Sequence, residues 1–207
     1  MKEVSVSFLK EGNYKEYIKQ INNSNADYIH FDVMDGKFVD NKNLPVKELI
    51  SLIDLSNKKN DIHLMVKNPE KYINALAYSN VNNITIHYEA DHLEKNINLI
   101  KSLGIKVGLA INPETDISKI KELISKVNII LIMGVHPGKS GQTFIDDTET
   151  KINDLKTIIN DNNLNTVLEV DGGVNNLVLE KVKNADILVS ASYLLDDLSR
   201  INVFKNS

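Results

Sequence analysis

The stretch Tyr28-Ile-His-Phe-Asp-Val-Met-Asp-Gly-Lys-Phe38 decides how the rest of the chain is interpreted. Side chains of a β-strand alternate between its two faces, so His30, Asp32 and Met34 would share one face while apolar residues fill the other. An imidazole and a carboxylate two residues apart on a strand can point at the same metal ion. Gly36 is expected to end the strand and to begin a loop. The pattern therefore predicts a strand that carries reactive side chains at its C-terminal end.

Apolar runs alternate with amphipathic stretches along almost the whole chain. Strands are expected at Val4–Phe8, Tyr28–Met34, Asp61–Val66, Asn83–Tyr88, Lys106–Ile111, Asn128–Val135, Thr166–Val170 and Ile187–Ser190. Helices are expected at Tyr14–Asn22, Val46–Leu55, Pro69–Tyr78, Leu93–Leu103, Ile117–Lys126, Thr148–Asn160, Asn176–Val182 and Tyr193–Phe204.

Eight strands that alternate with eight helices predict a parallel sheet covered by helices. The count favours a closed (β/α)8 TIM barrel, and an open doubly wound sheet is the alternative. No linker or break in composition interrupts the alternation, so residues 1–207 are expected to form one domain.

The composition narrows the classes of function. The chain is 42% hydrophobic, enough to bury a sizeable core, and its net charge of −4 gives no basic footprint for nucleic acid or an anionic membrane. It contains no cysteine, so a metal would have to bind to His and carboxylate side chains. Neither a signal-peptide apolar region nor a membrane-spanning run is found, and a cytoplasmic protein is expected.

Two further strand ends carry the same kinds of residue as the opening stretch. His63 lies on the third expected strand, and Asp171 directly follows the seventh. The active site of a TIM barrel lies at the C-terminal ends of its strands, so His30, Asp32, His63 and Asp171 would face one mouth. Any one of them alone is better explained as a hydrogen-bonded core or turn residue. The four together favour a site for one divalent ion such as Zn²⁺, Fe²⁺, Mn²⁺ or Co²⁺.

Glycine-rich turns follow two of the late strands. Val135-His-Pro-Gly-Lys-Ser-Gly-Gln142 follows the sixth strand, and Gly172-Gly173 follows the seventh. Backbone N–H groups in such turns can bind a phosphate, and the late loops of TIM barrels are a frequent phosphate site. Lys139 could add positive charge there. Ordinary tight turns and a solvated lysine are the alternative explanation.

Several other side chains would lie near the same mouth. Met34, Met65 and Met133 all fall at the ends of strands, where they would either fill the core or line a substrate cavity. Ser7 ends the first strand and could hydrogen-bond to the substrate or to metal-bound water. His87, on the fourth strand, is expected to make a structural hydrogen bond rather than to bind the metal.

A series of sequence blocks, in order and at the expected spacing, resembles the ribulose-phosphate 3-epimerase family. The resemblance runs from Val4 to about Ser192 and is therefore highly specific. The blocks are Ser7–Leu9, His30–Val39, Asp61–Val66, Ile84–Ala90, Gly108–Thr115, Met133–Gly138, Gly141–Gln142 and Glu169–Val174.

The resemblance implies a (β/α)8 barrel that reversibly epimerises D-ribulose 5-phosphate to D-xylulose 5-phosphate in the pentose phosphate pathway. It implies that His30, Asp32, His63 and Asp171 bind one divalent metal ion, with Asp32 and Asp171 as the acid/base pair. It also implies a homo-oligomer. The expected contacts to the phosphorylated ketopentose are Ser7, Met34, His63, Met65, Met133, Gly138, Lys139, Ser140, Gly141, Gly172, Gly173, Ala191 and Ser192.

The chain departs from the family pattern in the loops at the mouth. His136, Lys139 and Ser140 stand where Asn, Phe and Gly are usual, Ala191 stands where Gly is usual, and Asp40 stands where Pro is usual. These positions bear on substrate affinity and choice rather than on the metal residues. An epimerase of another ketose phosphate, such as allulose 6-phosphate, and a non-catalytic sugar-phosphate-binding barrel remain alternatives. A third alternative is a phosphosugar decarboxylase on a related barrel. Such an enzyme would need an Asp-x-Lys-x-x-Asp array, and no array that would suit it is expected in this chain.

Overall fold

The strands of the computed structural model close into a barrel. Among the residues that it describes, 1–9 and 12–207, eight strands pair in parallel in sequence order, and β1 also pairs with β8. This topology confirms the expected (β/α)8 fold. The strands are β1 (Glu3–Ser7), β2 (Tyr28–Met34), β3 (Lys59–Met65), β4 (Asn83–His87), β5 (Lys106–Ile111), β6 (Ile129–Met133), β7 (Val167–Asp171) and β8 (Ile187–Ser190).

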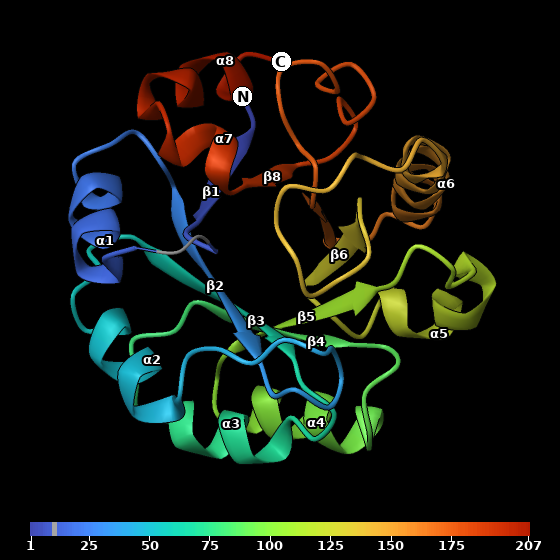
Figure 1. Ribbon diagram of the computed structural model, residues 1–207. Helices are drawn as coiled ribbons and strands as arrows, with labels where there is room; N and C mark the ends of the chain where they lie inside the picture. The colour runs from blue at the N-terminus through green and yellow to red at the C-terminus, as the bar shows by residue number, and fades with distance from the viewer. Residues whose placement is uncertain (10–11) are drawn as a thin grey trace.

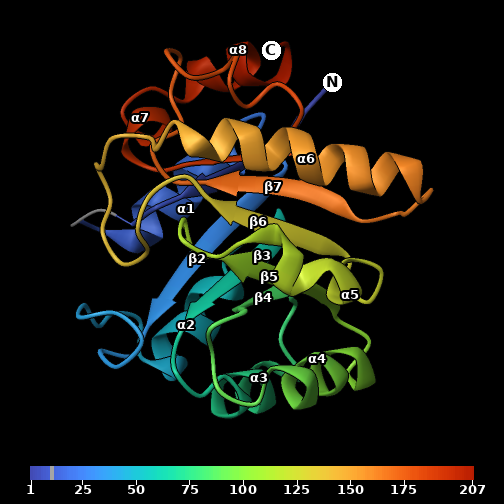
Figure 2. The same ribbon diagram turned by 90° about the vertical axis from the view of Figure 1, so that its right-hand side faces the viewer.

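Helices cover the outside of the barrel (Figure 1). In Figure 2 the arrowheads of the strands point toward the left, which is the side that faces the viewer in Figure 1. The helices are α1 (Tyr14–Asn22), α2 (Val46–Ile53), α3 (Glu70–Leu76), α4 (Leu93–Ser102), α5 (Lys121–Ile124), α6 (Asp147–Asp161), α7 (Ser192–Leu195) and α8 (Ile201–Lys205), with short 3-10 helices η1 (Ile117–Ile120) and η2 (Leu198–Arg200).

The strand β2 is buried along its whole length. Its apolar side chains Ile29, Phe31 and Val33 belong to the core that also contains the buried residues of the surrounding helices. The alternate residues His30 and Asp32 therefore point into the barrel, as the two-residue period of a strand requires. Both faces of a parallel strand are normally covered, which explains why the strands of this chain are so rich in Ile, Leu and Val.

Residues at three expected helix boundaries have the expected roles. Pro69 directly precedes α3, where its missing N–H is not needed. Gly104 follows α4 with a φ of +73°, a left-handed conformation that glycine adopts at little cost. The Asp116 carboxylate accepts a hydrogen bond from the Ser118 backbone N–H at the start of η1.

The helix expected at Asn176–Val182, between β7 and β8, is wrong. This segment forms consecutive turns, mostly with hydrogen bonds between residues three apart, such as Val178 N–H to the Asn175 carbonyl. The Asn175 side-chain oxygen accepts from the Leu177 N–H, as an N-cap residue does, but the turns that follow mostly keep a three-residue spacing and do not become α-helical.

Two other expected helices are divided into shorter segments. Residues 117–126 begin as η1 and become α-helical only in α5. The helix expected at Tyr193–Phe204 is interrupted at Asp197, whose backbone is extended with φ −157° and ψ 96°. The Asp197 carboxylate accepts from the Ser199 N–H and so starts a new helical segment.

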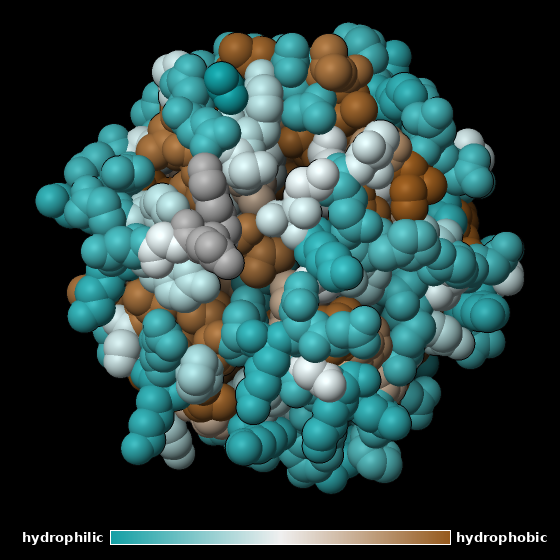
Figure 3. Space-filling view, viewed as in Figure 1, coloured by the Kyte–Doolittle hydropathy of each residue, from teal (hydrophilic) through white to brown (hydrophobic). Residues whose placement is uncertain are grey.

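The outer surface is mostly polar. Figure 3 shows hydrophilic residues over most of the face seen in Figure 1, with apolar residues exposed in small patches between them. Within residues 1–9 and 12–207, no helix combines the length and the apolar character that a bilayer crossing requires.

Candidate functional site

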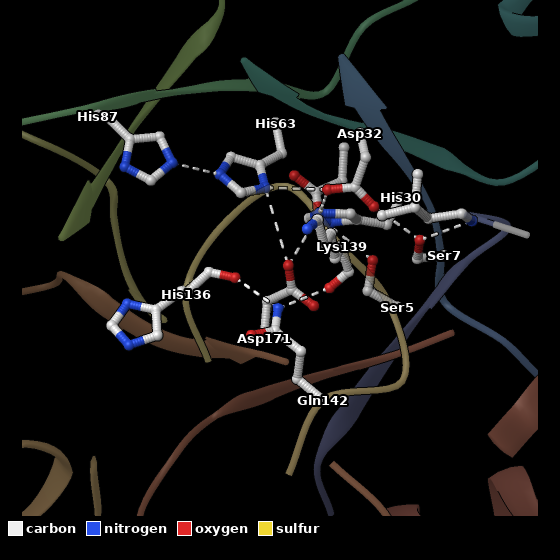
Figure 4. Close-up of polar contacts among 12 residues, drawn as sticks. Ser5, Ser7, His30, Asp32, His63, His87, His136, Lys139, Gln142 and Asp171 are labelled. Atoms are coloured by element: carbon white, nitrogen blue, oxygen red, sulfur yellow. Dashed lines mark hydrogen bonds and ion pairs between the residues drawn. The ribbon is translucent and has the colours of Figure 1, made fainter. Parts of the chain in front are cut away.

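The ends of β2, β3 and β7 bring four polar side chains together (Figure 4). One oxygen of Asp32 lies 3.4 Å from Nε2 of His30 and 3.1 Å from Nδ1 of His63. The Oδ2 atom of Asp171 lies 3.8 Å and 3.7 Å from the same two nitrogens. Two nitrogens and two oxygens thus all lie within 4.8 Å of one another. The pairing of β2 with β3 sets Asp32 directly beside His63.

This cluster fits a divalent metal ion. Nε2 of His30 is completely buried and has no hydrogen-bond partner among the described residues, although a buried nitrogen normally has one. Two imidazoles and two carboxylates form a donor set typical of borderline divalent cations. The residues present could therefore hold one such ion between the three strands.

Each imidazole is held by a partner on its other nitrogen. Nδ1 of His30 lies 2.6 Å from the Asp61 carboxylate, and Nε2 of His63 lies 2.8 Å from Nε2 of His87. Asp61 in turn accepts from the Asn83 amide at 2.5 Å. Such outer contacts orient metal-binding imidazoles, and here they leave His30 Nε2 and His63 Nδ1 directed at the centre of the cluster.

Asp61 and Glu169 were not assigned roles from the sequence, although their positions carry a signal. Asp61 lies two residues before His63, and Glu169 lies two residues before Asp171, so each shares the inward face of its strand. Both side chains are buried. Burial, and then the nearby Asp61 carboxylate, raise the pKa of Glu169 well above its ordinary value. Glu169 is therefore neutral beside an ionised Asp61 at neutral pH.

The two carboxylates of the cluster differ in protonation. Burial alone would raise the pKa of Asp32, but the charge of His30, its close contact with Asp32 and the hydrogen bond with His63 outweigh it and lower that pKa below the ordinary value. Burial, and then the negative charge of Asp32, raise the pKa of Asp171 to about 7. Asp32 is therefore ionised near neutral pH. Asp171 is about half protonated there, and its protonated fraction rises as the pH falls below 7.

Ser7 contacts the ionised carboxylate. Its hydroxyl donates to Oδ2 of Asp32 at 2.7 Å and accepts from the Leu9 N–H at 3.1 Å. Ser7 thus orients Asp32.

Burial lowers the pKa of His87 to about 4, so this neighbour of His63 is a neutral imidazole at neutral pH. A neutral imidazole carries one N–H proton, either on Nδ1 or on Nε2.

A cavity of about 430 Å³ opens over the cluster. Asp32 and Asp171 line its floor. The expected substrate contacts that line it are Ser7, Met65, Met133, Gly138, Lys139, Ser140, Gly141, Gly172, Gly173, Ala191 and Ser192. Two expected contacts are not among its lining residues: Met34, which is buried beside Met65 in the neighbouring strand, and His63, which is also buried. The volume suits a small phosphorylated sugar.

The loop between β6 and α6 forms one wall of this cavity and is held through its backbone. The Gln142 side-chain amide donates to the carbonyls of His136 and Lys139, at 2.7 Å and 2.8 Å. From the opposite loop, between β2 and α2, the Asn41 amide donates to the Gly138 carbonyl at 2.7 Å. A Cβ atom on Gly138 would lie 2.9 Å from the Val39 side chain, so only glycine allows the two loops to approach this closely.

The side chain of His136 is directed away from the cluster (Figure 4). It is exposed and pairs with Glu114 at 3.1 Å. His136 therefore does not contribute to the group of ligand atoms, although it lies on the rim of the cavity.

One stretch, Asp35-Gly-Lys-Phe-Val-Asp40, does carry the Asp-x-Lys-x-x-Asp spacing. None of its residues is among those lining the cavity. The Asp35 carboxylate instead accepts backbone N–H bonds from Lys37, Phe38 and Lys67 and so shapes the loop after β2. The spacing here therefore serves a turn, and the array is not placed for decarboxylation.

Comparison with known proteins gives consistent relatives. The profile of the Ribulose-phosphate 3 epimerase family matches residues 3–195. Ribulose-phosphate 3-epimerase of Helicobacter pylori is 38% identical over 180 residues, covering 86% of this chain and 83% of that protein. Ribulose-phosphate 3-epimerase of Bacillus subtilis is 36% identical over 196 residues, covering 92% and 89%.

A solved structure shares the fold at much lower identity. Phosphoribosyl anthranilate isomerase from Thermococcus kodakaraensis superposes with a TM-score of 0.67 at 17% identity, covering 100% of this chain and 98% of that one. This likeness bears on the barrel alone.

Proposed function

The chain belongs to the ribulose-phosphate 3-epimerase family of enzymes, and we propose that it interconverts D-ribulose 5-phosphate and D-xylulose 5-phosphate by proton transfer at C3. The observation that carries the proposal is the pair of carboxylates on one cavity floor, Asp32 ionised and Asp171 able to hold a proton. Epimerisation needs a base on one face of the carbon and an acid on the other. Two carboxylates with separated pKa values supply both.

The proton moves between the substrate and these two side chains. Asp32 removes the C3 proton, which is acidified by the neighbouring carbonyl, and leaves an enediolate. Asp171 returns a proton to the opposite face and inverts the centre. The roles are reversed in the other direction, so the same pair serves both substrates. Oδ2 of Asp32, which Ser7 contacts at 2.7 Å, is not the oxygen that lies beside both imidazoles, and it is the atom we assign to proton transfer.

His30, Asp32, His63 and Asp171 are the residues that would hold the metal ion. When bound, a divalent ion supplies Lewis-acid stabilisation of the negative charge that develops on the substrate oxygens. The buried walls of Met65 and Met133 keep bulk water from the reacting carbon.

The phosphate of the substrate is assigned to the glycine-rich side of the cavity. Gly138, Gly141, Gly172 and Gly173 line it and all have positive φ, a conformation typical of turns whose backbone N–H groups bind anions. Lys139, on the same rim, adds a positive charge, and Ser140, Ala191 and Ser192 complete this end.

The test is a coupled epimerase assay with D-ribulose 5-phosphate on protein reconstituted with Zn²⁺, Fe²⁺, Mn²⁺ or Co²⁺. We expect D-xylulose 5-phosphate, with deuterium at C3 when the reaction runs in D₂O. The Asp171→Asn variant should keep the fold, as judged by circular dichroism, and lose about 10²–10⁴-fold in turnover, because an amide cannot return the proton. Chelation should abolish activity, and readdition of metal should restore it.

The outcomes separate the alternatives. Normal turnover by Asp171→Asn would contradict the acid/base assignment. A larger kcat/KM on allulose 6-phosphate would make the chain an epimerase of that ketose. Binding of D-ribulose 5-phosphate without any exchange at C3 would point to a non-catalytic sugar-phosphate-binding barrel.

A further inference from the structure

We propose that Glu89 is a positioning residue, which acts through His87 to fix the tautomer of His63 and so directs His63 Nδ1 at the metal. This inference rests on the metal site of the proposed function. It concerns a carboxylate that is neither a ligand atom of the cluster nor among the residues lining the cavity.

Three side chains form a line that leads away from the cluster. Nε2 of His63 and Nε2 of His87 are 2.8 Å apart, and Nδ1 of His87 lies 3.4 Å from Oε2 of Glu89. Both imidazoles are fully buried, whereas the side chain of Glu89 is 25% exposed. In Figure 4 His87 lies on the side of His63 that faces away from Asp171. The line thus connects a ligand position to the edge of the barrel.

The contact between two Nε2 atoms allows only one proton between them. If His63 uses Nδ1 as a ligand atom, its own proton must be on Nε2, and His87 must accept that proton's hydrogen bond. The proton of neutral His87 is then on Nδ1. This buried Nδ1 has no hydrogen-bond partner among the described residues, and the charged acceptor beside it is Oε2 of Glu89, 3.4 Å away.

The carboxylate of Glu89 divides its two oxygens between separate tasks. Oε1 accepts from the Asn112 backbone N–H at 3.2 Å and from the Thr115 hydroxyl, which anchors the loop after β5. Oε2 remains for His87.

An aromatic ring packs against His87, the middle member of this line. Phe38, from the loop after β2, lies with its ring centroid 4.6 Å from that of His87. The Phe38 ring therefore limits access of a solvent molecule that could replace Glu89 as the acceptor.

The Glu89→Gln variant replaces the acceptor that faces His87 by a donor. It leaves the contacts of residue 89 with Asn112 and Thr115 in place. The Asn112 N–H can only donate, so the glutamine carbonyl oxygen is held at the Oε1 position and the NH₂ group faces His87. His87 then accepts at Nδ1 and carries its proton on Nε2, where it meets the Nε2 proton of His63. We expect the Zn²⁺ dissociation constant, measured by competition with a chromogenic chelator, to rise about 10–100-fold.

A second measurement reads the tautomers directly. In ¹H–¹⁵N spectra of the Zn²⁺-loaded wild type, we expect His63 to be protonated at Nε2 and His87 at Nδ1. In Glu89→Gln, we expect the His87 proton at Nε2. Thr115→Val is the matched control, because it removes a partner of Oε1 only, and it should bind Zn²⁺ within about twofold of the wild type.

Three results would overturn the inference. One is a wild-type spectrum with the His87 proton on Nε2, a result that does not depend on the folding of any variant. Another is Zn²⁺ binding by Glu89→Gln equal to that of the wild type. A third is equal weakening in Thr115→Val, which would make Glu89 a loop anchor only. A wild type that binds no Zn²⁺ would instead overturn the metal site itself, and this inference with it.

Discussion

His30 and Asp171 both favour a bound proton in the metal-free protein. Burial alone would lower the pKa of His30, but the carboxylates of Asp61 and Asp32 outweigh it and raise that pKa well above 6.5. The pKa of Asp171 is raised to about 7. A metal ion, however, needs the free nitrogen lone pair of His30 and competes with the bound proton for the carboxylate of Asp171. Binding must therefore displace protons wherever the pH lies below these pKa values.

We therefore predict that Zn²⁺ binding at pH about 6 releases more than one proton per ion. The apparent affinity should rise with pH as the pH passes through 7, because the metal-free state then has fewer protons to lose. Isothermal titration calorimetry in two buffers with different ionisation enthalpies measures the number directly. Equal heats in the two buffers would mean that no proton is released and would contradict the prediction.

At this scale the sequence predicts which residues meet, but not how they are supported. His30, Asp32, His63 and Asp171 could be identified because a two-residue period places them inward, near strand ends that meet in a barrel. The contacts of Asp61 with His30, and of His87 with His63 and Glu89, could not. They depend on side-chain rotamers and on which nitrogen each ring presents, and neither is a property of spacing.

Among the elements, the loop between β6 and α6 contributes most to the proposed phosphate end. Lys139 is exposed and lines the cavity there. We predict that Lys139→Met raises KM for D-ribulose 5-phosphate about 3–10-fold with little change in kcat, since an exposed charge contact adds about 1 kcal/mol to binding and is remote from C3. Steady-state kinetics at low and at high salt measure the effect.

The matched control is Lys37→Met. This exposed lysine lies in the loop after β2 and is not among the residues lining the cavity. Its KM should remain near that of the wild type. The Lys139 effect should shrink at high salt, because exposed charges are screened. A fall in kcat alone would place Lys139 in the chemical step instead.

The strands were predicted more accurately than the helices. Runs such as Ile129–Met133 are buried on both faces, and their apolar character is visible in the sequence. The segment between β7 and β8 has apolar residues at helical spacing, yet it forms turns. The apolar Leu177 in this segment is 82% exposed instead of packing against the barrel. Whether an amphipathic segment becomes a helix depends on the surface available for it, which sequence periodicity does not contain.

Across the whole molecule, closure of the barrel brings together the two ends of the chain. β1 pairs with β8, and the Lys2 N–H donates to the Lys205 carbonyl at 3.2 Å, which joins α8 to the first strand. Phe204 of α8 is completely buried in the main core. The eight-fold pattern predicted this closure, whereas the homo-oligomer implied by the family resemblance stays a prediction.

We predict that Phe204→Ala lowers the free energy of unfolding by about 3–5 kcal/mol, because it removes a buried ring and leaves a cavity. Urea denaturation measures the loss. The neighbouring Val203 is 55% exposed, so Val203→Ala should change stability by less than about 0.5 kcal/mol. Equal stability of the two variants would show that α8 is not part of the cooperative core. Both should retain epimerase activity under conditions where they are folded.

The path of the loop between β6 and α6 depends on main-chain atoms. Gln142 and Asn41 hold it through the carbonyl oxygens of His136, Gly138 and Lys139, and every residue type has such an oxygen. Evolution can therefore exchange side chains at positions 136, 139 and 140 without redirecting the loop. The His, Lys and Ser of this chain at these positions can thus alter what the rim of the cavity presents to a ligand, whereas Gly138, Gln142 and Asn41 hold the shape of the rim itself.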